Sequence, residues 1–524
     1  MSKIISVEEA AGLVRDGMTV GIGGFCGFGA PESLLIELGR RFRKTGSPRD
    51  LTVVTSASAG DGEEDGLGLS ALKGEGQLKA LYSSIVKLPP AIHRAVNENR
   101  IAAYLLPLSL FGHLYRAAAG GEPGVLTHVG LGTYCDPRQE GCRMNDKAKQ
   151  SGAEVVRLMP VDGKDYLFYP VIPMDIALIR GTYADEEGNI STEEEAVRSE
   201  VLELANAVHN RGGIVIAEVK GIVEKGSLDP RLVTVHKRSI DYVVQSREGE
   251  HPHFYASPDY RPELVGEVRV PLESIPPMKM GVRKVIARRA AMELRKGALV
   301  NLGLGISDGI ATVANEEGVS DQIALTIETG LMGGVPLMGM GLGAGINPEA
   351  LYKMPDTFDL YDGGGLDQAF LSGAEIDRYG NVNVSKFNGR VTGPGGFINI
   401  AQNTPQVCFS GVFTAGREQD IRVEDGKLNI VRDGDVIKYV DRVEQITFSG
   451  AYAAQTGKDI LFISERCVMR LTREGIVLTE IAPGVDLQKH ILDKMAFRPI
   501  VSPDLKLMDE RIFRDEPMGL TLKE

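Results

Sequence analysis

The sequence predicts an α/β protein made of two tandem homologous α/β domains whose sheets are mainly parallel. Three observations support this fold class. The chain has 524 residues, which is enough for two to four domains. In both halves, short apolar runs typical of strands, such as 214–219 and 322–327, alternate with helical patterns. A pair of motifs also occurs twice in the same order, which indicates an internal duplication.

The first motif of each copy is a helix followed by a strand and a glycine turn. In the first copy, Ser6 and Glu9 form a capping box that predicts the start of the helix, and the strand and turn follow at 18–24. In the second copy, the helix is predicted from Arg283 to a glycine at its end, and the strand and turn at 298–305. The two strands align with a constant offset of 280 residues.

The second motif lies further along each copy. Residues 175–181 match 367–373, and the Gly-Asn pair at 188–189 matches the pair at 380–381. The offset here is 192, so the first copy carries 88 more residues than the second between its two motifs. The matching order of the motifs makes duplication a better explanation than chance similarity of glycine-rich segments.

A proline-spaced stretch separates the copies. Prolines recur through 257–262 and again in 275–278, a pattern that is typical of an extended linker. We therefore predict an N-terminal domain at 1–275, which holds the additional residues, and a C-terminal domain at 276–524.

Composition excludes several classes of function. The net charge is −13 and no long Lys/Arg block occurs, which argues against nucleic acid as a partner. A polyanionic ligand would need a local basic patch or helix N-termini against this overall charge. The 63 glycines cluster in short motifs, which implies many tight turns or close approaches of backbone to ligand.

Cysteine and apolar patterns predict a cytoplasmic protein without a metal. The five cysteines are an odd number without CxxC spacing, and the eight histidines include no HxxxH pair, so we expect free thiols and no metal site. The N-terminus lacks the apolar core of a signal peptide. The longest apolar run, 101–113, is interrupted by Pro107 and is too short to span a membrane.

Glu328 is the leading candidate for chemistry. It directly follows the predicted strand 322–327, and ligands of open α/β sheets collect beyond the carboxyl ends of strands. One interpretation is an exposed turn acid before Gly330. A second is a dinucleotide site, in which a Gly303/Gly305 turn is followed by an acid that grips ribose. Against this second interpretation, Asp308 stands where the fingerprint has its third glycine.

A third interpretation makes Glu328 a covalent nucleophile. Such chemistry requires donors for a developing oxyanion and turns that let substrate approach the backbone. The sequence offers Asn301 in the adjacent turn and two glycine clusters, 363–365 and 392–396. The glycine-rich run 333–345 after Glu328 suits a loop that lies against a ligand.

In their order along the chain, these motifs resemble the class I coenzyme A transferases. The second half resembles that family at 300–307, 328–330, 363–367 and 393–396, and the first half at 21–25. Three further segments are similar to the fused, single-chain propionate/acetate CoA-transferase branch, namely 167–170, 181–185 and 480–486.

The resemblance implies a CoA-transferase-like fold and specific roles for four residues. Glu328 holds the position of the nucleophilic glutamate, while Asn301 and the amide of Gly395 or Gly396 match positions that bind the thioester oxygen. The implied reaction moves coenzyme A from a short-chain acyl-CoA to a carboxylate acceptor of the acetate/propionate class, by a ping-pong mechanism through a glutamyl-CoA thioester. Coenzyme A is then a substrate, and neither cofactor nor metal is expected.

Two other functions stay open at this point. One is an NAD-linked dehydrogenase built on the Gly303/Gly305 turn, and the other is a non-catalytic acyl-CoA-binding protein. The expected partners are acyl-CoA and short-chain carboxylates, together with further copies of the chain in a homo-oligomer, but neither nucleic acid nor membrane. The chain departs from the common family pattern at Ser307 and Thr329, and by the absence of histidine between residues 40 and 92.

Overall fold

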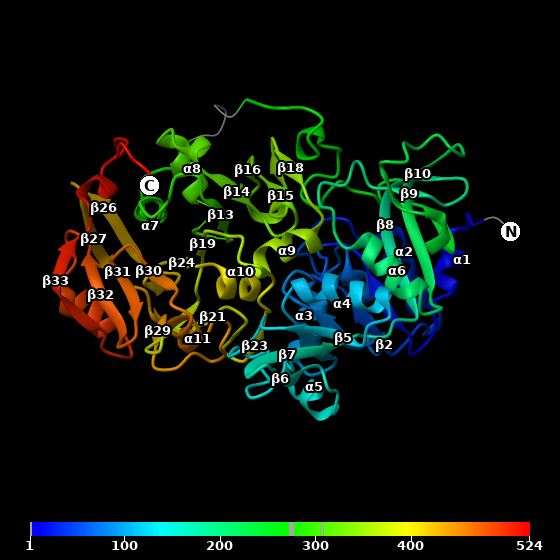
Figure 1. The fold of residues 1–524 in the computed structure, drawn as a ribbon, viewed down its shortest axis with the longest axis horizontal. Helices are drawn as coiled ribbons and strands as arrows, with labels where there is room; N and C mark the ends of the chain where they lie inside the picture. Colours follow the sequence, from blue (N-terminus) through cyan, green and yellow to red (C-terminus); the bar gives the residue numbers. More distant parts are fainter. Residues whose placement is uncertain (1–2, 272–276, 304, 308) are drawn as a thin grey trace.

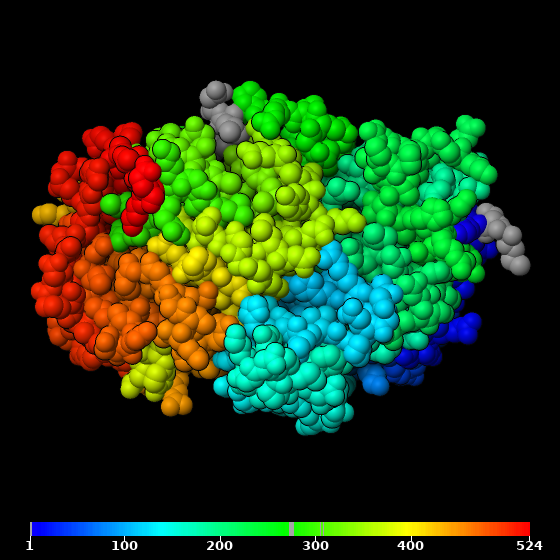
Figure 2. All heavy atoms as spheres, in the orientation of Figure 1, coloured from blue at the N-terminus to red at the C-terminus, as the bar shows by residue number. Residues whose placement is uncertain are grey.

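Two large sheets, one in each half of the chain, organise the structure. The computed structural model describes residues 3–271, 277–303, 305–307 and 309–524. The first half lies at the right of Figure 1 with the N-terminus, and the second half lies at the left with the C-terminus. In the space-filling view the two halves are in contact along a broad front (Figure 2). The predicted boundary near residue 275 falls outside the described residues.

The sheet of the first half is mainly parallel. Its parallel strands run in the spatial order β4-β3-β2-β1-β8-β10-β12, and β9 and β11 extend it in antiparallel fashion. The strands are β1 (Thr19–Ile22), β2 (Leu51–Val54), β3 (Leu78–Ser83), β4 (Ala102–Leu105), β8 (Ile176–Asp185), β9 (Ile190–Ser191), β10 (Ile214–Val223), β11 (Val233–Val235) and β12 (Tyr242–Gln245). The helices of this half include α1 (Val7–Gly12), α2 (Glu32–Thr45), α3 (Pro90–Asn97), α4 (Ser109–Gly120), α5 (Asp146–Gln150) and α6 (Val201–His209).

The sheet of the second half has a parallel centre, and its margins contain antiparallel pairs. Its centre is β14-β13-β19-β24-β30, bordered by β15 and β18 on one side and by β31, β32 and β33 on the other. The strands are β13 (Leu299–Leu302), β14 (Ala324–Thr326), β15 (Leu331–Met332), β18 (Ala350–Leu351), β19 (Gln368–Leu371), β24 (Gln406–Ser410), β30 (Asp459–Ile463), β31 (Cys467–Thr472), β32 (Gly475–Ile481) and β33 (Ile500–Leu507). The helices include α7 (Val282–Ala291), α8 (Gly309–Glu316), α9 (Met354–Asp362), α10 (Phe397–Asn403) and α11 (Gly450–Gln455).

The register of the central strands confirms the internal duplication. In the first half, β1 and β8 pair Val20 with Ile176. In the second half, β13 and β19 pair Val300 with Gln368, which are the residues expected from the two sequence offsets. The two-domain α/β fold class predicted from the sequence is therefore confirmed.

Equivalent aspartates fix this register in both halves. The carboxylate of Asp175 accepts a hydrogen bond from the Thr19 amide at 2.7 Å. The carboxylate of Asp367 accepts one from the Leu299 amide at 2.8 Å. Each aspartate precedes the second strand of its pair and satisfies the first amide of the neighbouring strand, so the duplicated sequence motif has one structural task.

The additional residues of the first half extend its sheet and add a small one. Between β2 and β8 the first half has β3, α3, β4, α4 and a three-stranded sheet with the spatial order β5-β7-β6, where the second half has short strands, a 3₁₀ turn and α9 between β14 and β19. These strands are β5 (Gly124–Thr127), β6 (Arg157–Val161) and β7 (Lys164–Pro170). Through α3 and α4 this part of the first half reaches the second half, where α4 packs on α9 (Figure 1).

Two predicted elements are shorter than expected. The helix predicted from Arg283 to Gly297 ends at Ala291, although its predicted inner face remains buried. The strand predicted at 322–327 begins only at Ala324, after a 3₁₀ turn. The Gly297 amide still donates to the Gln322 carbonyl at 2.7 Å, but Gln322 belongs to the 3₁₀ turn Ser320–Gln322, so the extended strand begins after it. The predicted capping box of α1 is confirmed, with Ser6 and Glu9 bonding reciprocally.

Each half has its own hydrophobic core, and the two cores exchange residues where the halves meet. Val391 and Ile398 of the second half join the core of the first. Phe25 and Phe28 of the first half join the core of the second. This exchange fixes the relative placement of the halves at the wall of the cavity described below.

Candidate active site

Glu328 stands on a tight turn between β14 and β15. The turn is closed by hydrogen bonds from the Ile327 amide to the Leu331 carbonyl, at 3.1 Å, and from the Gly330 amide to the Ile327 carbonyl, at 3.0 Å. Gly330 has a φ of 119°, and a Cβ there would lie 2.0 Å from the Tyr352 carbonyl oxygen. Only glycine fits this position. The turn therefore holds Glu328 in one place at the carboxyl end of the sheet.

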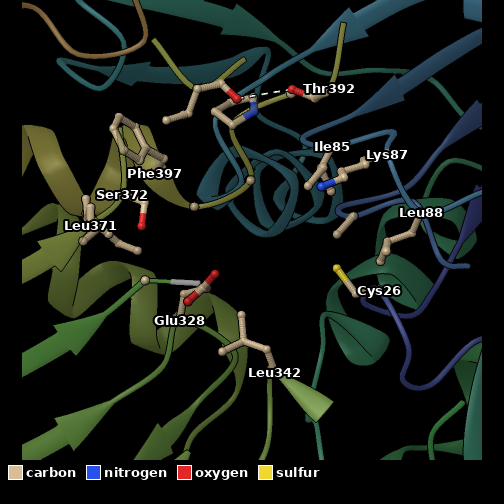
Figure 3. Close-up of a pocket in the computed structure, with 18 of the residues that line it drawn as sticks. Cys26, Ile85, Lys87, Leu88, Glu328, Leu342, Leu371, Ser372, Thr392 and Phe397 are labelled. Atoms are coloured by element: carbon tan, nitrogen blue, oxygen red, sulfur yellow. Dashed lines mark hydrogen bonds between the residues drawn. The ribbon is translucent and has the colours of Figure 1, made fainter. Parts of the chain in front are cut away.

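Glu328 lines a cavity of about 370 Å³ between the two halves. The first half contributes two wall segments, Phe25–Cys26 and Ile85–Leu88, together with Ala57. The remaining lining comes from the second half and is largely apolar. Figure 3 shows the Glu328 carboxylate facing the cavity, with Cys26, Lys87 and Leu88 on the opposite side. The predicted interpretation of Glu328 as an exposed turn acid is wrong, because the side chain is half-buried in this cavity.

Burial dominates the electrostatics of the site. Burial raises the pKa of Glu328 above its ordinary value, and a hydrogen bond from its own backbone amide opposes this rise in part. Burial, with a smaller effect from Glu328, raises the pKa of Cys26 to about 12, so the Cys26 thiol stays protonated at neutral pH. An ionised Glu328 is therefore a poorly solvated carboxylate in an apolar cavity, a setting that favours nucleophilic attack.

Gly396 lies directly beside the Glu328 carboxylate. A Cβ atom on Gly396 would lie 3.2 Å from Oε1 and 3.3 Å from Cγ of Glu328. The neighbouring Gly395 has a φ of 57° and donates its amide hydrogen to the Ser84 carbonyl at 3.1 Å. For the Gly396 amide, no hydrogen bond is found within the described part of the chain. Of the two predicted glycines, Gly396 is thus the one whose amide is available next to Glu328.

Asn301 lies on β13, next to β14, and also lines the cavity. Its side chain is buried, and Nδ2 donates to the Thr326 carbonyl at 3.2 Å and to the Tyr361 hydroxyl at 3.3 Å. Its Oδ1 is buried, and none of the described residues donates a hydrogen bond to it. A half-turn of the side-chain amide would place Nδ2 where Oδ1 now stands. Asn301 is therefore near the cavity as predicted, but its donor group is held by Thr326 and Tyr361.

The other glycine motifs divide into those that reach the cavity and those that do not. Gly339, Met340 and Leu342 of the run 333–345 line it, as does Gly303 of the turn after β13. The cluster 363–365 is not part of the lining; it ends α9 and leads into β19. Asp308, which weighed against a dinucleotide site, lies outside the described residues.

Sequence reasoning missed the contribution of the first half to the cavity. Ile85, Lys87 and Leu88 follow the carboxyl end of β3, where ligands of α/β sheets are expected. Their position after a strand end was the signal in the sequence that could have identified them as cavity residues. No motif marks these residues, and their proximity to Glu328 depends on how the halves pack.

Within the described ranges, no group of three or more His, Cys, Asp and Glu side chains is arranged to hold a metal ion. None of the helices described is long and apolar enough to cross a membrane.

Comparison with known proteins places the chain in a family. Residues 4–246 match the family model described as coenzyme A transferase. The chain is 40% identical over 524 residues to the acetate CoA-transferase YdiF of Escherichia coli K12, covering 99% of this chain and 97% of that protein. It is 42% identical over 525 residues to the caffeate CoA-transferase of Acetobacterium woodii, covering 99% of each.

Solved structures agree with the sequence comparison. The crystal structure of the YdiF acyl-CoA transferase apoenzyme from Escherichia coli O157:H7 matches with a TM-score of 0.94 and 39% identity, over 100% of this chain and 98% of that one. A thioester complex of the same protein with CoA matches with a TM-score of 0.92 over the same shares of both chains, also at 39% identity. The chain therefore belongs to the class I coenzyme A transferase family, in its fused single-chain branch.

Proposed function

We propose that the protein transfers coenzyme A from a short-chain acyl-CoA to a carboxylate acceptor of the acetate/propionate class, with Glu328 as the nucleophile. One observation carries the proposal: of the described residues that line the cavity, Glu328 alone bears a carboxylate, and it faces the space between the halves. The names of the relatives, acetate and caffeate CoA-transferase, support the reaction class. The thioester complex of a similar protein with CoA supports acyl-CoA as the ligand.

The reaction follows from the chemistry of a carboxylate and a thioester. One Glu328 oxygen attacks the carbonyl carbon of the acyl-CoA; the carbon–sulfur bond breaks, which releases CoA thiolate and leaves an acyl–glutamyl anhydride. The thiolate then attacks the glutamyl carbonyl carbon, the anhydride carbon–oxygen bond breaks, and the first acid leaves as its carboxylate. A second carboxylate reverses both steps. The energy of the thioester is conserved in an enzyme bond, so the steps need no cofactor.

Two donors are proposed to stabilise the negative oxygen of the tetrahedral intermediates. The amide of Gly396 lies next to the Glu328 carboxylate, and the Ser84 carbonyl already engages the alternative amide of Gly395. Asn301 supplies the second donor after its side-chain amide turns away from Thr326. Removing one oxyanion donor typically lowers kcat by about 100-fold or more.

The apolar lining protects the intermediates. An anhydride and a thioester both react with water, and residues such as Phe25, Leu342 and Phe397 leave little polar surface to hold it in the cavity. The protonated thiol of Cys26 is likewise a poor competitor for the CoA thiolate.

Ping-pong kinetics test the proposed mechanism. Initial rates with propionyl-CoA as donor, measured at several fixed concentrations of acetate, should give parallel double-reciprocal lines, because the first acid leaves before the second binds. Glu328→Gln serves as the inactive control. Converging lines would indicate a ternary complex and contradict a covalent carrier. A non-catalytic acyl-CoA-binding protein would bind propionyl-CoA without turnover, and the comparisons lend no support to the dehydrogenase interpretation.

The cysteines and one exposed apolar surface bear on where the enzyme works and how it assembles. We place the enzyme in the cytoplasm, supported by five cysteines that are all unpaired, four of them buried. We also propose a homo-oligomer. Exposed apolar side chains share one face of the small three-stranded sheet, with Leu126 on β5 and Met159 and Val161 on the edge strand β6, and a second copy would cover them.

A further inference from the structure

Coenzyme A carries several negative charges, and so does this protein. With a net charge of −13, the chain must offer a local cluster of cations to hold such a ligand against the overall charge. The cavity at Glu328 contains one basic residue among its described lining, Lys87. Lys87 is exposed and lies across the cavity from Glu328 (Figure 3).

A contact between the halves brings a second cation, Arg390, near Lys87. His93 of α3 contacts the Val391 carbonyl oxygen through Nε2 at 2.7 Å, and the Asn97 side chain accepts a hydrogen bond from the Val391 amide at 2.7 Å. Val391 belongs to β23 (Arg390–Val391), so Arg390 is held next to α3. The neighbouring Phe387 lines the cavity, which places this hairpin at its rim.

The charge of this rim is positive on both sides. Burial is the largest cause of the lowered pKa of His93; the charges of Arg390 and Lys87 lower it further, and the contact with Val391 opposes them. Both cations therefore lie close to His93. Arg390 is exposed, and within the described residues neither Lys87 nor Arg390 forms an ion pair or side-chain hydrogen bond. Two exposed cations at a cavity mouth, with no carboxylate of the described residues paired to them, form a local positive field that can attract an anionic ligand to an otherwise acidic protein.

We propose that the basic rim, defined as Lys87, His93 and Arg390, binds the phosphate groups of coenzyme A. The inference rests on the proposed function and identifies the residues that hold the charged end of its substrate. Lys87 and Arg390 supply the charge, while His93 and its contact with Val391 hold the two sides of the rim together. Because one side belongs to each half, the phosphates would bridge the halves above the reacting thioester.

The main competitor is a role for Lys87 toward the acid itself. A single carboxylate needs only one cation, and the reacting carboxylate must reach Glu328 on the far side of the cavity. The pairing of Lys87 with Arg390 at the exposed mouth suits a ligand of higher charge that stays outside, which favours phosphate over carboxylate.

Truncating the substrate separates the two roles. Rates of transfer to acetate are measured with propionyl-CoA and with propionyl-pantetheine, which has the same thioester but no phosphates. For Lys87→Gln and Arg390→Gln, kcat/KM with propionyl-CoA should fall by about tenfold or more, as expected for lost hydrogen bonds to charged groups. With propionyl-pantetheine, each variant should match the wild-type enzyme.

Matched controls use cations away from the rim. Lys79 is exposed at the amino end of β3, opposite the end that leads to Lys87, and Arg473 is exposed in the turn between β31 and β32. Lys79→Gln and Arg473→Gln should behave as wild type with both donors.

The outcomes distinguish the rim from the function it serves. If kcat/KM of a rim variant falls equally with both donors, its residue acts on the acid or at the reacting centre, and the inference is overturned. Wild-type values for both rim variants would also overturn it. Calorimetric binding of free coenzyme A is measured in parallel. If the wild-type enzyme transfers no coenzyme A, the proposed function fails. The binding measurement still tests the rim in that case: weaker coenzyme A binding by the rim variants than by the control variants supports it, and equal binding contradicts it.

Discussion

At the scale of single residues, the sequence identified Glu328 as the candidate nucleophile but did not predict which residues surround it. Glu328 could be placed at a strand end because an apolar run and a following glycine are local signals. The hydrogen bonds of the Asn301 side chain could not be predicted, because its partner Tyr361 lies on a helix 60 residues away. The presence of Cys26 and Lys87 in the cavity could not be predicted either, because they face Glu328 only through the packing of the two halves.

The closeness of Gly396 to Glu328 yields a prediction at this scale. The φ of Gly396 is −79°, so alanine is compatible with the backbone, but its Cβ would press on the carboxylate from 3.2 Å. Gly396→Ala should fold normally and lose activity by about 100-fold, because a small displacement of the reacting carboxylate removes near-attack geometry. Melting temperature and kcat are measured together.

Gly12→Ala is the matched control, since a Cβ there meets no atom within 4 Å. Its activity should equal that of the wild-type enzyme. A Gly396→Ala enzyme with normal kcat would show that Glu328 has more room than the structure gives it, and would remove the reason for assigning the oxyanion donor to Gly396.

At the scale of elements, specific side-chain interactions predicted element boundaries better than apolar patterns did. The predicted capping box of α1 is confirmed, because it depends only on Ser6 and Glu9, which lie three residues apart and bond to each other. The early start assigned to the strand before Glu328 was wrong, because the apolar pattern of 322–327 does not reveal that Gln322 closes a 3₁₀ turn. The hairpin that follows, β14 to β15, was not predicted, although it holds Glu328 in place.

A substitution at Gly330 tests how the β14–β15 hairpin holds Glu328. Gly330→Ala combines an unfavourable φ of 119° with a Cβ 2.0 Å from the Tyr352 carbonyl oxygen. The free energy of unfolding should fall by about 2 kcal/mol or more, and activity should fall with it because the turn that carries Glu328 must open. Urea unfolding and kcat measure the two effects.

Gly457→Ala separates backbone strain from the clash. Gly457 has a φ of 71°, but a Cβ there meets no atom within 4 Å, so it should lose only about 1 kcal/mol and keep full activity. If both variants lose the same stability, the contact between residue 330 and Tyr352 is not what fixes the turn.

At the scale of the whole molecule, the duplication was the strongest signal in the sequence. Two motifs with fixed offsets predicted two α/β halves, and the paired strands have the register that those offsets require. Duplication describes each half but not how the halves face each other, because that depends on side chains distant in sequence, such as those that exchange between the cores. The cavity is a product of that packing, and the boundary between 1–275 and 276–524 remains a proposal.

The central claim is that Glu328 carries coenzyme A as a covalent thioester, and trapping this adduct tests it most directly. Incubation with propionyl-CoA without an acceptor acid should add the mass of CoA less one water to the peptide that contains Glu328. Borohydride should then reduce the thioester and inactivate the enzyme, while enzyme without propionyl-CoA should be unaffected. Glu328→Gln should fold, form no adduct and lose turnover. A folded Glu328→Gln enzyme with near wild-type transfer, or an adduct on another residue, would contradict the assignment of Glu328.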